Sequence, residues 1–381
     1  MFSKALFLLT CPALVLQASV IISNYPYQNG NGGTTIDTNN GLESKAAGFT
    51  MPAGLVYMMD SATVRLAVSD TSAVVRWALY GGASGPQYLV SDLYGSNLTA
   101  GSSDYLLRPV GGALLRPGET YWLVERGMSG GINALRWVAD SSPGQTPTGL
   151  ATSAGYLFNG SGGLPDSASS IQNIFEVRGT EFTPHVAFGN YAPQLNDAVK
   201  TQLPAAPGYL DLATGFTVPE GEDYWFRGLS LRLTLGSGGS EIPKLRRGSP
   251  NGEVVANLIT TPFHNGTGDR FFFPAEYLLL RAGESYWIDF GGSVSGGIIS
   301  WNAGGTPGIG PTGAFQSLGY MTSTDGSNYQ ASNLFYSFEL FADALAPAPL
   351  PPPSDVPEPA TVLLALVGLG SCWILRKKTS L

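Results

Sequence analysis

Hydrophobic and polar residues alternate along short stretches of this chain. In VRLAV at residues 64–68 and LRLTL at residues 231–235, every second residue is apolar, which is the period of a strand with one buried face. VVRWALY, TYWLVE and IFEVRG are rich in β-branched and aromatic residues, and Gly, Pro, Ser and Asp cluster between such stretches. Since no stretch of the body keeps a helical period over three turns, the pattern predicts an all-β fold.

The predicted strands occur twice in the same order. ALLRPGETYWLV from Ala113 is matched by LLLRAGESYWID from Leu278, and ATVRLAVSD from Ala62 by LSLRLTLGS from Leu229. SNYPYQNG pairs with GNYAPQLN, AGFTMPAG with TGFTVPEG, and NIFEV with NLFYSFEL. A repeat of this length is the mark of a duplicated domain. We predict two tandem antiparallel β-sandwich domains of the jelly-roll or Greek-key kind, at residues 20–180 and 183–343, with a minimal linker between them.

The N-terminus predicts export. Lys4 precedes an apolar run and Ala18 is a small residue at its end, so residues 1–18 are expected to be a signal peptide that is cleaved after about Ala18. An alternative is lipidation at Cys11, which follows LLT. The other cysteine, Cys372, lies near the C-terminus, so the exported body is expected to hold no disulfide and no thiolate metal site.

The C-terminal segment predicts a spacer followed by a membrane span. The proline-rich residues 344–355 favour a stiff, extended polyproline conformation. Residues 360–375 are uncharged and almost wholly apolar, and as a helix they would span roughly 24 Å of a hydrocarbon core that is about 30 Å thick. Three cations follow and favour a cytoplasmic C-terminus: Arg376, Lys377 and Lys378. These cations disfavour the alternative of a buried core helix.

These parts carry a family resemblance. Pro357, Glu358 and Pro359 stand before the apolar segment, and the cations close it. In this order, behind an N-terminal signal, residues 356–381 resemble the PEP-CTERM sorting signal of exported proteins in Gram-negative bacteria. The resemblance implies transient recognition by an exosortase, a membrane cysteine transpeptidase-like enzyme, with cleavage near the Pro-Glu-Pro triplet. It also implies that the helix holds the protein in the inner membrane before processing, and that the product reaches the cell surface, the extracellular matrix or a biofilm.

The duplicated body is similar to the choice-of-anchor R domain, an extracellular module found with different surface anchors. The residues that carry the similarity are FT…P, VRLAV, GETYWLV, a later Trp and a final aromatic strand. In the middle of the unit, copy two has KLRRGSPNGEVVANL, and copy one departs from it with ALYGGASGPQYLVSDL. Because that family has no assigned enzymatic activity, the resemblance implies an architecture more than a function.

Composition and motifs disfavour several function classes. The net charge of −8 provides no basic stripe, so no nucleic-acid partner is expected. His185 and His264 occupy non-equivalent places in the two copies, H-E-x-x-H is absent, and no G-x-S-x-G elbow between a strand and a helix is predicted. Glu119 and Glu284 recur once per copy before Tyr-Trp, at predicted turns, so they do not form the carboxylate pair of a glycoside hydrolase. We expect no catalytic residue, no cofactor and no enzymatic activity.

Two groups of residues are candidates for binding. PEGEDYW at residues 219–225 concentrates three carboxylates that could hold Ca²⁺, but copy one has PAGLVYM there, so solvated loop charges are favoured and no metal site is predicted. Four tryptophans at matching positions could stack on a sugar ring, although core packing is the favoured interpretation: Trp122, Trp137, Trp287 and Trp301.

The sequence therefore predicts an exported, non-enzymatic protein of the cell surface or extracellular matrix, with a structural or adhesive role. Two alternatives stay open, a carbohydrate-binding module protein and a carbohydrate-active enzyme, and for both of them exopolysaccharide would be the partner. An exposed row of aromatic side chains would favour the binding module.

Overall fold

The computed structural model describes residues 18–25, 32–36, 43–129, 134–140, 145–191, 199–203, 210–236, 242–260, 265–292, 299–304 and 310–345. The described residues up to Asp343 form one compact unit. The predicted signal peptide up to residue 17, the sorting triplet, the apolar segment 360–375 and its flanking cations lie outside the described residues. Within the described ranges we find no helix whose length and hydrophobicity would suit a membrane crossing.

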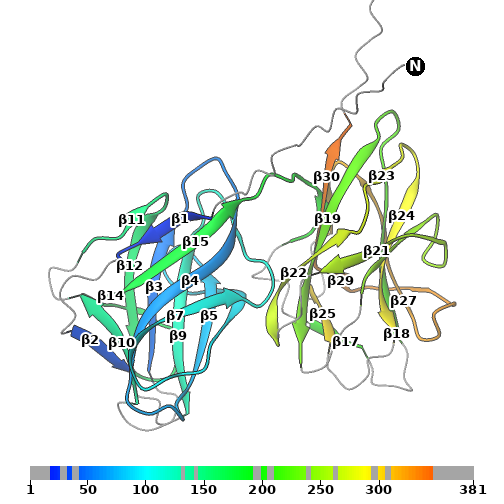
Figure 1. The fold of residues 1–381 in the computed structure, drawn as a ribbon. Coiled ribbons are helices and arrows are strands. Elements are labelled where there is room, and N and C mark those ends of the chain that lie inside the picture. The colour runs from blue at the N-terminus through cyan, green and yellow to red at the C-terminus, as the bar shows by residue number, and fades with distance from the viewer. Residues whose placement is uncertain are drawn as a thin grey trace, which may run out of the picture. The chain divides into compact units, whose positions relative to one another are not determined.

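The first half of the chain forms one curled antiparallel sheet, which we call repeat 1 (Figure 1). Its strands are β1 (Ser19–Ser23), β2 (Gly32–Ile36), β3 (Ser44–Thr50), β4 (Tyr57–Val68), β5 (Val74–Gly81), β6 (Tyr88–Gly95), β7 (Gly101–Pro109), β8 (Leu114–Leu115), β9 (Thr120–Ser129), β10 (Leu135–Asp140), β11 (Thr148–Gly149), β12 (Thr152–Asn159), β13 (Ser167–Ala168), β14 (Gln172–Asn173) and β15 (Phe175–Glu181).

The second half forms a matching sheet, repeat 2. Its strands are β16 (Val186–Gly189), β17 (Val199–Gln202), β18 (Leu210–Thr217), β19 (Tyr224–Leu235), β20 (Lys244–Arg247), β21 (Glu253–Thr260), β22 (Gly266–Pro274), β23 (Leu278–Leu280), β24 (Ser285–Gly292), β25 (Ile299–Gly304), β26 (Thr312–Gly313), β27 (Gln316–Ser323), β28 (Gln330–Ala331), β29 (Phe335–Tyr336) and β30 (Phe338–Ala344).

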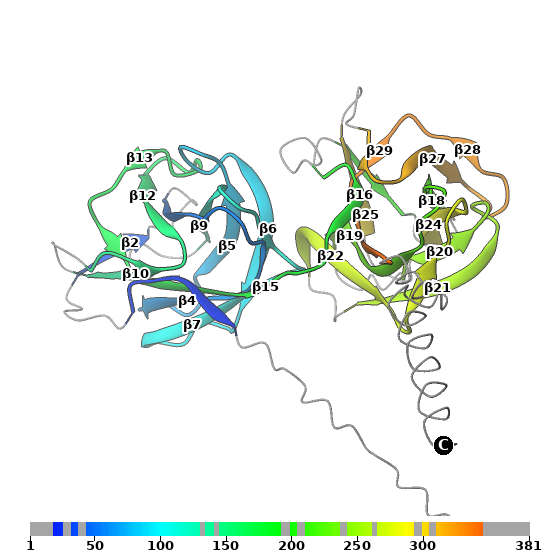
Figure 2. The ribbon, with the colours of Figure 1, turned by 90° about the horizontal axis from the view of Figure 1, so that it is seen from above.

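The two sheets share one topology. The main path runs β11-β1-β15-β4-β7-β6-β5-β9-β3-β12-β13 in repeat 1 and β26-β16-β30-β19-β22-β21-β20-β24-β18-β27-β28 in repeat 2. The first strand of each repeat carries a bulge at the same place, between Val20 and Ile22 and between Val186 and Phe188. Each sheet curls around its own interior (Figure 2) and fits a β-sandwich. The all-β prediction is confirmed, and no helix occurs in the described part of the chain.

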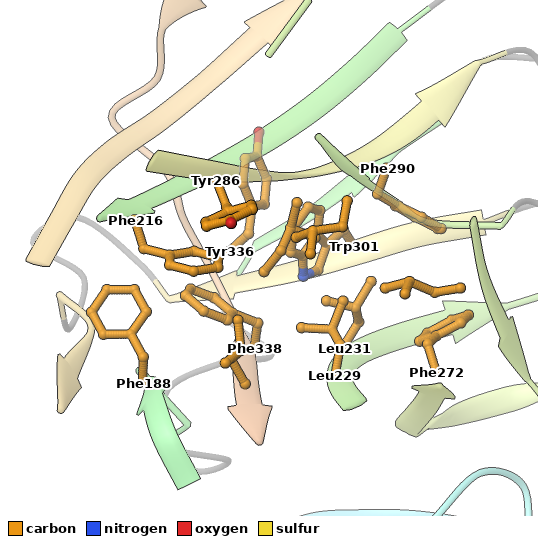
Figure 3. Packing of buried hydrophobic residues seen from close by; sticks show 14 of the residues in the cluster. Phe188, Phe216, Leu229, Leu231, Phe272, Tyr286, Phe290, Trp301, Tyr336 and Phe338 are labelled. Atoms are coloured by element: carbon orange, nitrogen blue, oxygen red, sulfur yellow. The ribbon is translucent and has the colours of Figure 1, made fainter. Parts of the chain in front are cut away.

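Each repeat encloses a core rich in aromatic side chains. In repeat 2, the indole of Trp301 stacks on Tyr336 with ring centroids 4.9 Å apart, and Phe290 meets it edge-on at 5.7 Å (Figure 3). In repeat 1, Trp137 meets Trp77 edge-on at 5.0 Å. Burying each large aromatic side chain removes about 150–250 Å² from water. The alternating apolar side chains at residues 64–68 and 231–235 are buried, so they line the inner faces of these sheets.

The repeated PGET and AGES strings form the same turn in both repeats. Gly118 and Gly283 adopt φ values of 72° and 73°, a left-handed conformation that glycine adopts without steric cost. In each repeat, a buried tyrosine lies two residues after the glutamate of the turn and donates its hydroxyl to that carboxylate. Tyr121 donates to Glu119 over 2.9 Å, and Tyr286 donates to Glu284 over 2.7 Å. These turns deliver β9 and β24 into the sheet, and their glutamates act as local acceptors.

Candidate functional site

A buried arginine connects the two repeats. Arg232 on β19 is 1% exposed, and its Nη2 donates to the carbonyl oxygen of Leu89 on β6 over 2.6 Å. Its Nη1 donates to the neighbouring carbonyl of Val90 and to Asp269 Oδ1 at 3.2 Å. Asp269 lies directly opposite Arg232 on β22. A desolvated guanidinium is stable only with such partners, so repeat 1 completes the hydrogen bonding of a charge that repeat 2 buries.

Burial raises the pKa of Asp269, and the Arg232 guanidinium opposes that shift. Tyr191 donates a hydrogen bond to the same carboxylate, and burial raises the pKa of this phenol far above its usual value. The phenol therefore stays a donor at physiological pH. Asp269 is the shared acceptor of this contact.

A second ion pair lies beside the first. Both carboxylate oxygens of Glu339 on β30 accept from Arg116 Nη2 of repeat 1, each at 2.7 Å. The guanidinium also lies over the Tyr191 ring, 4.7 Å from its centroid, within the range of a cation–π interaction. Burial raises the pKa of Glu339, and Arg116 opposes the shift. The pair is thus largely withdrawn from solvent, so the loss of either partner would leave the other charge buried and unpaired.

The backbones also approach closely at this place. The amide of Gly112 donates to the carbonyl of Asp269 over 2.7 Å, and the amide of Thr267 donates to Asp92 Oδ2 over 2.9 Å. A Cβ on Gly111 would lie 1.9 Å from the Asp269 carbonyl oxygen. The contact therefore requires glycine in repeat 1.

An apolar cluster accompanies these polar contacts: Leu114, Phe271 and Phe341, with Val56, Met58 and Phe182 packed against them. Phe182 meets the Phe341 ring edge-on, with centroids 5.0 Å apart. We call the whole contact the junction. Its polar groups are paired across it and its apolar groups are packed, as in the centre of a specific protein interface.

Repeat 2 holds a second cluster of buried charges that sequence reasoning missed. Asp211 and Asp289 both lie within hydrogen-bond distance of the Tyr329 hydroxyl, at 3.1 and 3.2 Å. Arg246 Nε donates to Asp289 Oδ2 over 2.6 Å. Burial and the two carboxylates raise the pKa of Tyr329. Since Asp289 is engaged by Arg246 and Tyr329, the cluster holds the segment around residue 329 against the sheet.

The same place in repeat 1 is apolar. Val124 stands where repeat 2 has Asp289, and Tyr80 where it has Arg246, by the strand registers. These residues belong to a small hydrophobic cluster with Ala46, Ala78 and Trp122. The charged cluster is thus specific to repeat 2. A comparison of the two copies, strand by strand, could have found this cluster. Such a comparison needs the pairing registers of the strands, which the sequence alone does not give.

The four matched tryptophans are buried, so they offer no ring face to a ligand, and the stacking interpretation is wrong for them: Trp122, Trp137, Trp287 and Trp301. Their positions follow the core interpretation. The indole nitrogens of Trp122, Trp137 and Trp301 donate to backbone carbonyls at 2.7 to 2.9 Å. These tryptophans stabilise the repeats and form no site.

The other candidates from the sequence are separate from one another. In PEGEDYW, Glu222 accepts from Tyr224, and Asp223 accepts from the amide of Ala282 and from Arg281. These carboxylates serve protein donors. His185 is exposed, and His264 lies outside the described residues. Across the described ranges, no three His, Cys, Asp or Glu side chains are grouped as a metal ion would need.

A different set of aromatic residues lies at the surface of repeat 2. Tyr277 is 89% exposed, and its ring meets Trp225 edge-on at 6.2 Å. Phe273 is also exposed. Two adjoining hollows of about 220 and 250 Å³ share the residues from Pro274 to Tyr277. Exposed aromatic rings beside polar groups favour ligand or partner binding. The sequence signal that points to them is Glu-Tyr in copy two where copy one has Gly-Gly.

Comparisons of the chain with protein-family models, with curated proteins and with solved structures returned no match. The resemblances to the PEP-CTERM sorting signal and to the choice-of-anchor R domain are therefore predictions from the residues quoted for them.

Proposed function

We propose that this chain is an exported, non-enzymatic protein of the cell surface or extracellular matrix, and that its two repeats act together as one structural or adhesive unit. The observation that supports this most is the junction. Arg232 and Glu339 are buried there and find their partners in the other repeat or on the neighbouring strand. Separating the repeats would expose these charges and the apolar cluster, so the tandem resists bending and pulling.

The proposed route follows from the two ends of the chain. The signal peptide directs export, the apolar segment 360–375 holds the chain in the inner membrane, and an exosortase cleaves near Pro357 to Pro359. Mass spectrometry of the mature termini, in the host and in a strain that lacks its exosortase, tests this route. We expect the signal peptide to be removed in both strains, which gives an N-terminus near residue 19. A C-terminus near residue 358 should appear only in the strain that has its exosortase. An intact Leu381 in both strains would contradict the processing.

The structural role is tested by deleting the chain and restoring it. We expect the deletion to weaken the cohesion of the matrix or the adhesion of the cells, and the wild-type chain to restore it. Restoration by an Arg232→Met variant should be incomplete, because that variant opens the junction. A deletion strain with unchanged cohesion and adhesion would contradict the structural role.

A second candidate function is carbohydrate binding, which the exposed ring of Tyr277 beside the half-buried Trp225 favours. Aromatic faces can cover the apolar face of a sugar ring while neighbouring polar groups bind its hydroxyls. The matrix polysaccharide of the host, tested by affinity electrophoresis against a Tyr277→Ala variant, distinguishes this candidate. The carbohydrate-active enzyme has less support, since Arg246 and Tyr329 engage the buried carboxylate Asp289 of the repeat 2 cluster.

A further inference from the structure

The junction joins two different faces of one domain type. Repeat 2 contributes its sheet face, on β19, β22, β30 and the segment that follows β16, with these residues: Tyr191, Arg232, Asp269, Phe271, Glu339 and Phe341. Repeat 1 contributes its loop face, on β6 and the segment that follows β7, with these residues: Leu89, Val90, Asp92, Gly111, Gly112 and Arg116. Because the repeats share one topology, each repeat has both faces. The junction is therefore a head-to-tail contact, and it leaves one sheet face and one loop face unused.

The unused sheet face belongs to repeat 1 and keeps the polar pattern of the used one. Arg65 lies opposite Asp104 and pairs with it at 2.8 Å, as Arg232 lies opposite Asp269. The Tyr25 hydroxyl donates to Asp104 over 2.8 Å, in the role that Tyr191 has in repeat 2. Glu176 stands at the position of Glu339, since Phe175 and Phe338 make the same contacts with Asn24 and Asn190.

This face lies at the surface. The side chain of Asp104 is 46% exposed, whereas that of Asp269 is 3% exposed. Leu106, at the position of Phe271, is 44% exposed. Arg178, at the position of Phe341, pairs with Glu176 at 2.6 Å and is 45% exposed. The side chains of Arg65 and Glu176 are 25% and 17% exposed, so the same residue pattern is desolvated in repeat 2 and partly exposed in repeat 1.

The unused loop face belongs to repeat 2 and is the exposed aromatic surface described above. Registers of β8 on β4 and β23 on β19 set Leu279 at the position of Leu114. By the same count, Arg281 stands at the position of Arg116, and Glu276 and Tyr277 at the positions of the two glycines. Arg281 is 60% exposed. The residues that would meet a sheet face are thus present and open to solvent.

The differences between the two unused faces and the junction are complementary. Where the junction sets Gly112 against the large Phe271 ring, the unused faces offer the large Tyr277 and the smaller Leu106. The unused loop face gains the carboxylate of Glu276, and the unused sheet face gains the guanidinium of Arg178. Since Glu276 carries a Cβ where the junction tolerates none, the backbones must stay further apart, and we expect a weaker, reversible contact.

We propose that the loop face of repeat 2 binds the sheet face of repeat 1 in a second copy of this chain, so that molecules associate head to tail. In this contact Arg281 binds Glu176, the Val254 and Val255 carbonyls accept from Arg65, and Tyr277 covers Leu106. A contact between two different faces does not close a dimer and generates open chains of molecules. The inference rests on the proposed structural role, which such chains would serve in a matrix.

The test is the concentration dependence of mass for the exported chain purified from its host. We expect the weight-average mass from sedimentation to rise from micromolar to near-millimolar concentration without stopping at a dimer. Arg281→Glu and Glu176→Arg should each weaken association by about tenfold or more, because each places like charges in contact. The double variant should recover it. Arg136→Glu, an exposed charge on β10, is the matched control and should leave association unchanged.

Mixing the two single variants tests the head-to-tail geometry directly. Each single variant repels its own copies, whereas in an equal mixture both mixed contacts pair opposite charges, so the mixture should grow into open chains in which the two variants alternate. Tyr277→Ala should weaken association without changing the free energy of unfolding, since this side chain is exposed. A mass that is constant with concentration, or a mixture that stays monomeric, would overturn the inference.

The outcomes separate this inference from the proposed function and from carbohydrate binding. Constant mass together with a cohesion defect in the deletion strain keeps the structural role and rejects self-association. A mass that grows with concentration, together with unchanged cohesion and adhesion in the deletion strain, keeps self-association and rejects the structural role. Constant mass with loss of polysaccharide binding in Tyr277→Ala would reject self-association and assign the same surface to a glycan.

Discussion

Arg232 of repeat 2 donates to the carbonyl oxygen of Leu89 in repeat 1 over 2.6 Å, from a position that is almost wholly desolvated. Repeat 1 has an arginine at the same place, Arg65, which pairs with Asp104 at the surface. One sequence pattern thus produces a buried ion pair in one copy and an exposed ion pair in the other. The two copies serve as each other's controls.

The first prediction concerns this pair of arginines. Replacing Arg232 by Met leaves Asp269 buried without its guanidinium, so the free energy of unfolding should fall by roughly 3–5 kcal/mol. The matched change Arg65→Met removes an exposed pair and should cost about 0–1 kcal/mol. Urea unfolding of the purified chain measures both. Equal effects of the two substitutions would mean that burial at the junction adds nothing to the pair.

The second prediction concerns the close approach of backbones at Gly111. An alanine Cβ there would meet the Asp269 carbonyl at 1.9 Å, and a backbone atom cannot turn aside as a side chain can. Gly111→Ala should therefore destabilise the chain by roughly 1–3 kcal/mol and open the junction. Limited proteolysis in the segment between β15 and β16, at residues 182–185, should become faster. Glu276→Ala, the equivalent exposed position of repeat 2, is the control and should leave the cleavage rate as it is.

The third prediction concerns a buried pair at one end of the repeat 1 core. Glu125 is fully buried and its two carboxylate oxygens have no hydrogen-bond partner. Burial raises its pKa well above the usual range, although Lys45 opposes the shift. Lys45 lies opposite Glu125 on β3, with its ammonium over the Phe158 ring, and burial lowers the pKa of Lys45 to about 8. At the same places the repeat 2 strands carry Leu212 and Phe290.

The pH dependence follows from these directions. Because folding raises the pKa of Glu125, its contribution to stability is largest below the usual pKa of glutamate and is lost as the pH rises toward the folded value. Lys45 has a lowered pKa, so its contribution acts in the opposite direction and grows from about pH 8 upward. The double variant Lys45→Leu/Glu125→Leu should be more stable at neutral pH by roughly 1–4 kcal/mol. Its free energy of unfolding should also vary less with pH.

Thermal and urea unfolding at several pH values check this prediction. Glu253→Gln is the matched control, because Glu253 is exposed on β21 and should change neither the stability nor its pH profile by much. A double variant that loses stability at neutral pH would contradict the interpretation, since it would mean that the charges favour the fold.

The fourth prediction concerns the charged cluster of repeat 2. Tyr329→Phe removes a hydroxyl from between Asp211 and Asp289, and the loss of a hydrogen bond to a buried charge should cost about 1.5–3 kcal/mol. The control Tyr277→Phe removes a hydroxyl from an exposed ring and should be neutral. If both substitutions are neutral, the hydroxyl of Tyr329 does not bind the carboxylates in solution.

Much of the architecture was predictable because the alternation in VRLAV and LRLTL is itself the record of a buried face. The repeat was visible for the same reason, since both copies must fill equivalent cores with equivalent residues. Trp137 and Trp301 were correctly favoured as core residues, because their places recur within strand patterns. The pairing of strands was not predictable, since local sequence does not contain the register of residues that are far apart in the chain.

The surfaces were predictable only in part. The sequence shows Glu276 and Tyr277 in copy two where copy one has Gly111 and Gly112. What this difference does depends on the surface that each loop contacts, which the sequence does not show. Asp211, Asp289 and Tyr329 come from three separate strands or loops, so no spacing in the sequence connects them.

By itself, the sequence determined the fold class, the duplication and the inward-facing residues, because burial inside one sheet leaves a periodic pattern. The tertiary structure alone decided that Arg232 is desolvated while Arg65 is only half-buried, and that Gly111 must be glycine. The alternation of apolar and polar residues shows which side of a strand faces the core of its own sheet. It does not show what contacts the other side. What covers that outer side depends on which surface of the chain is packed against it.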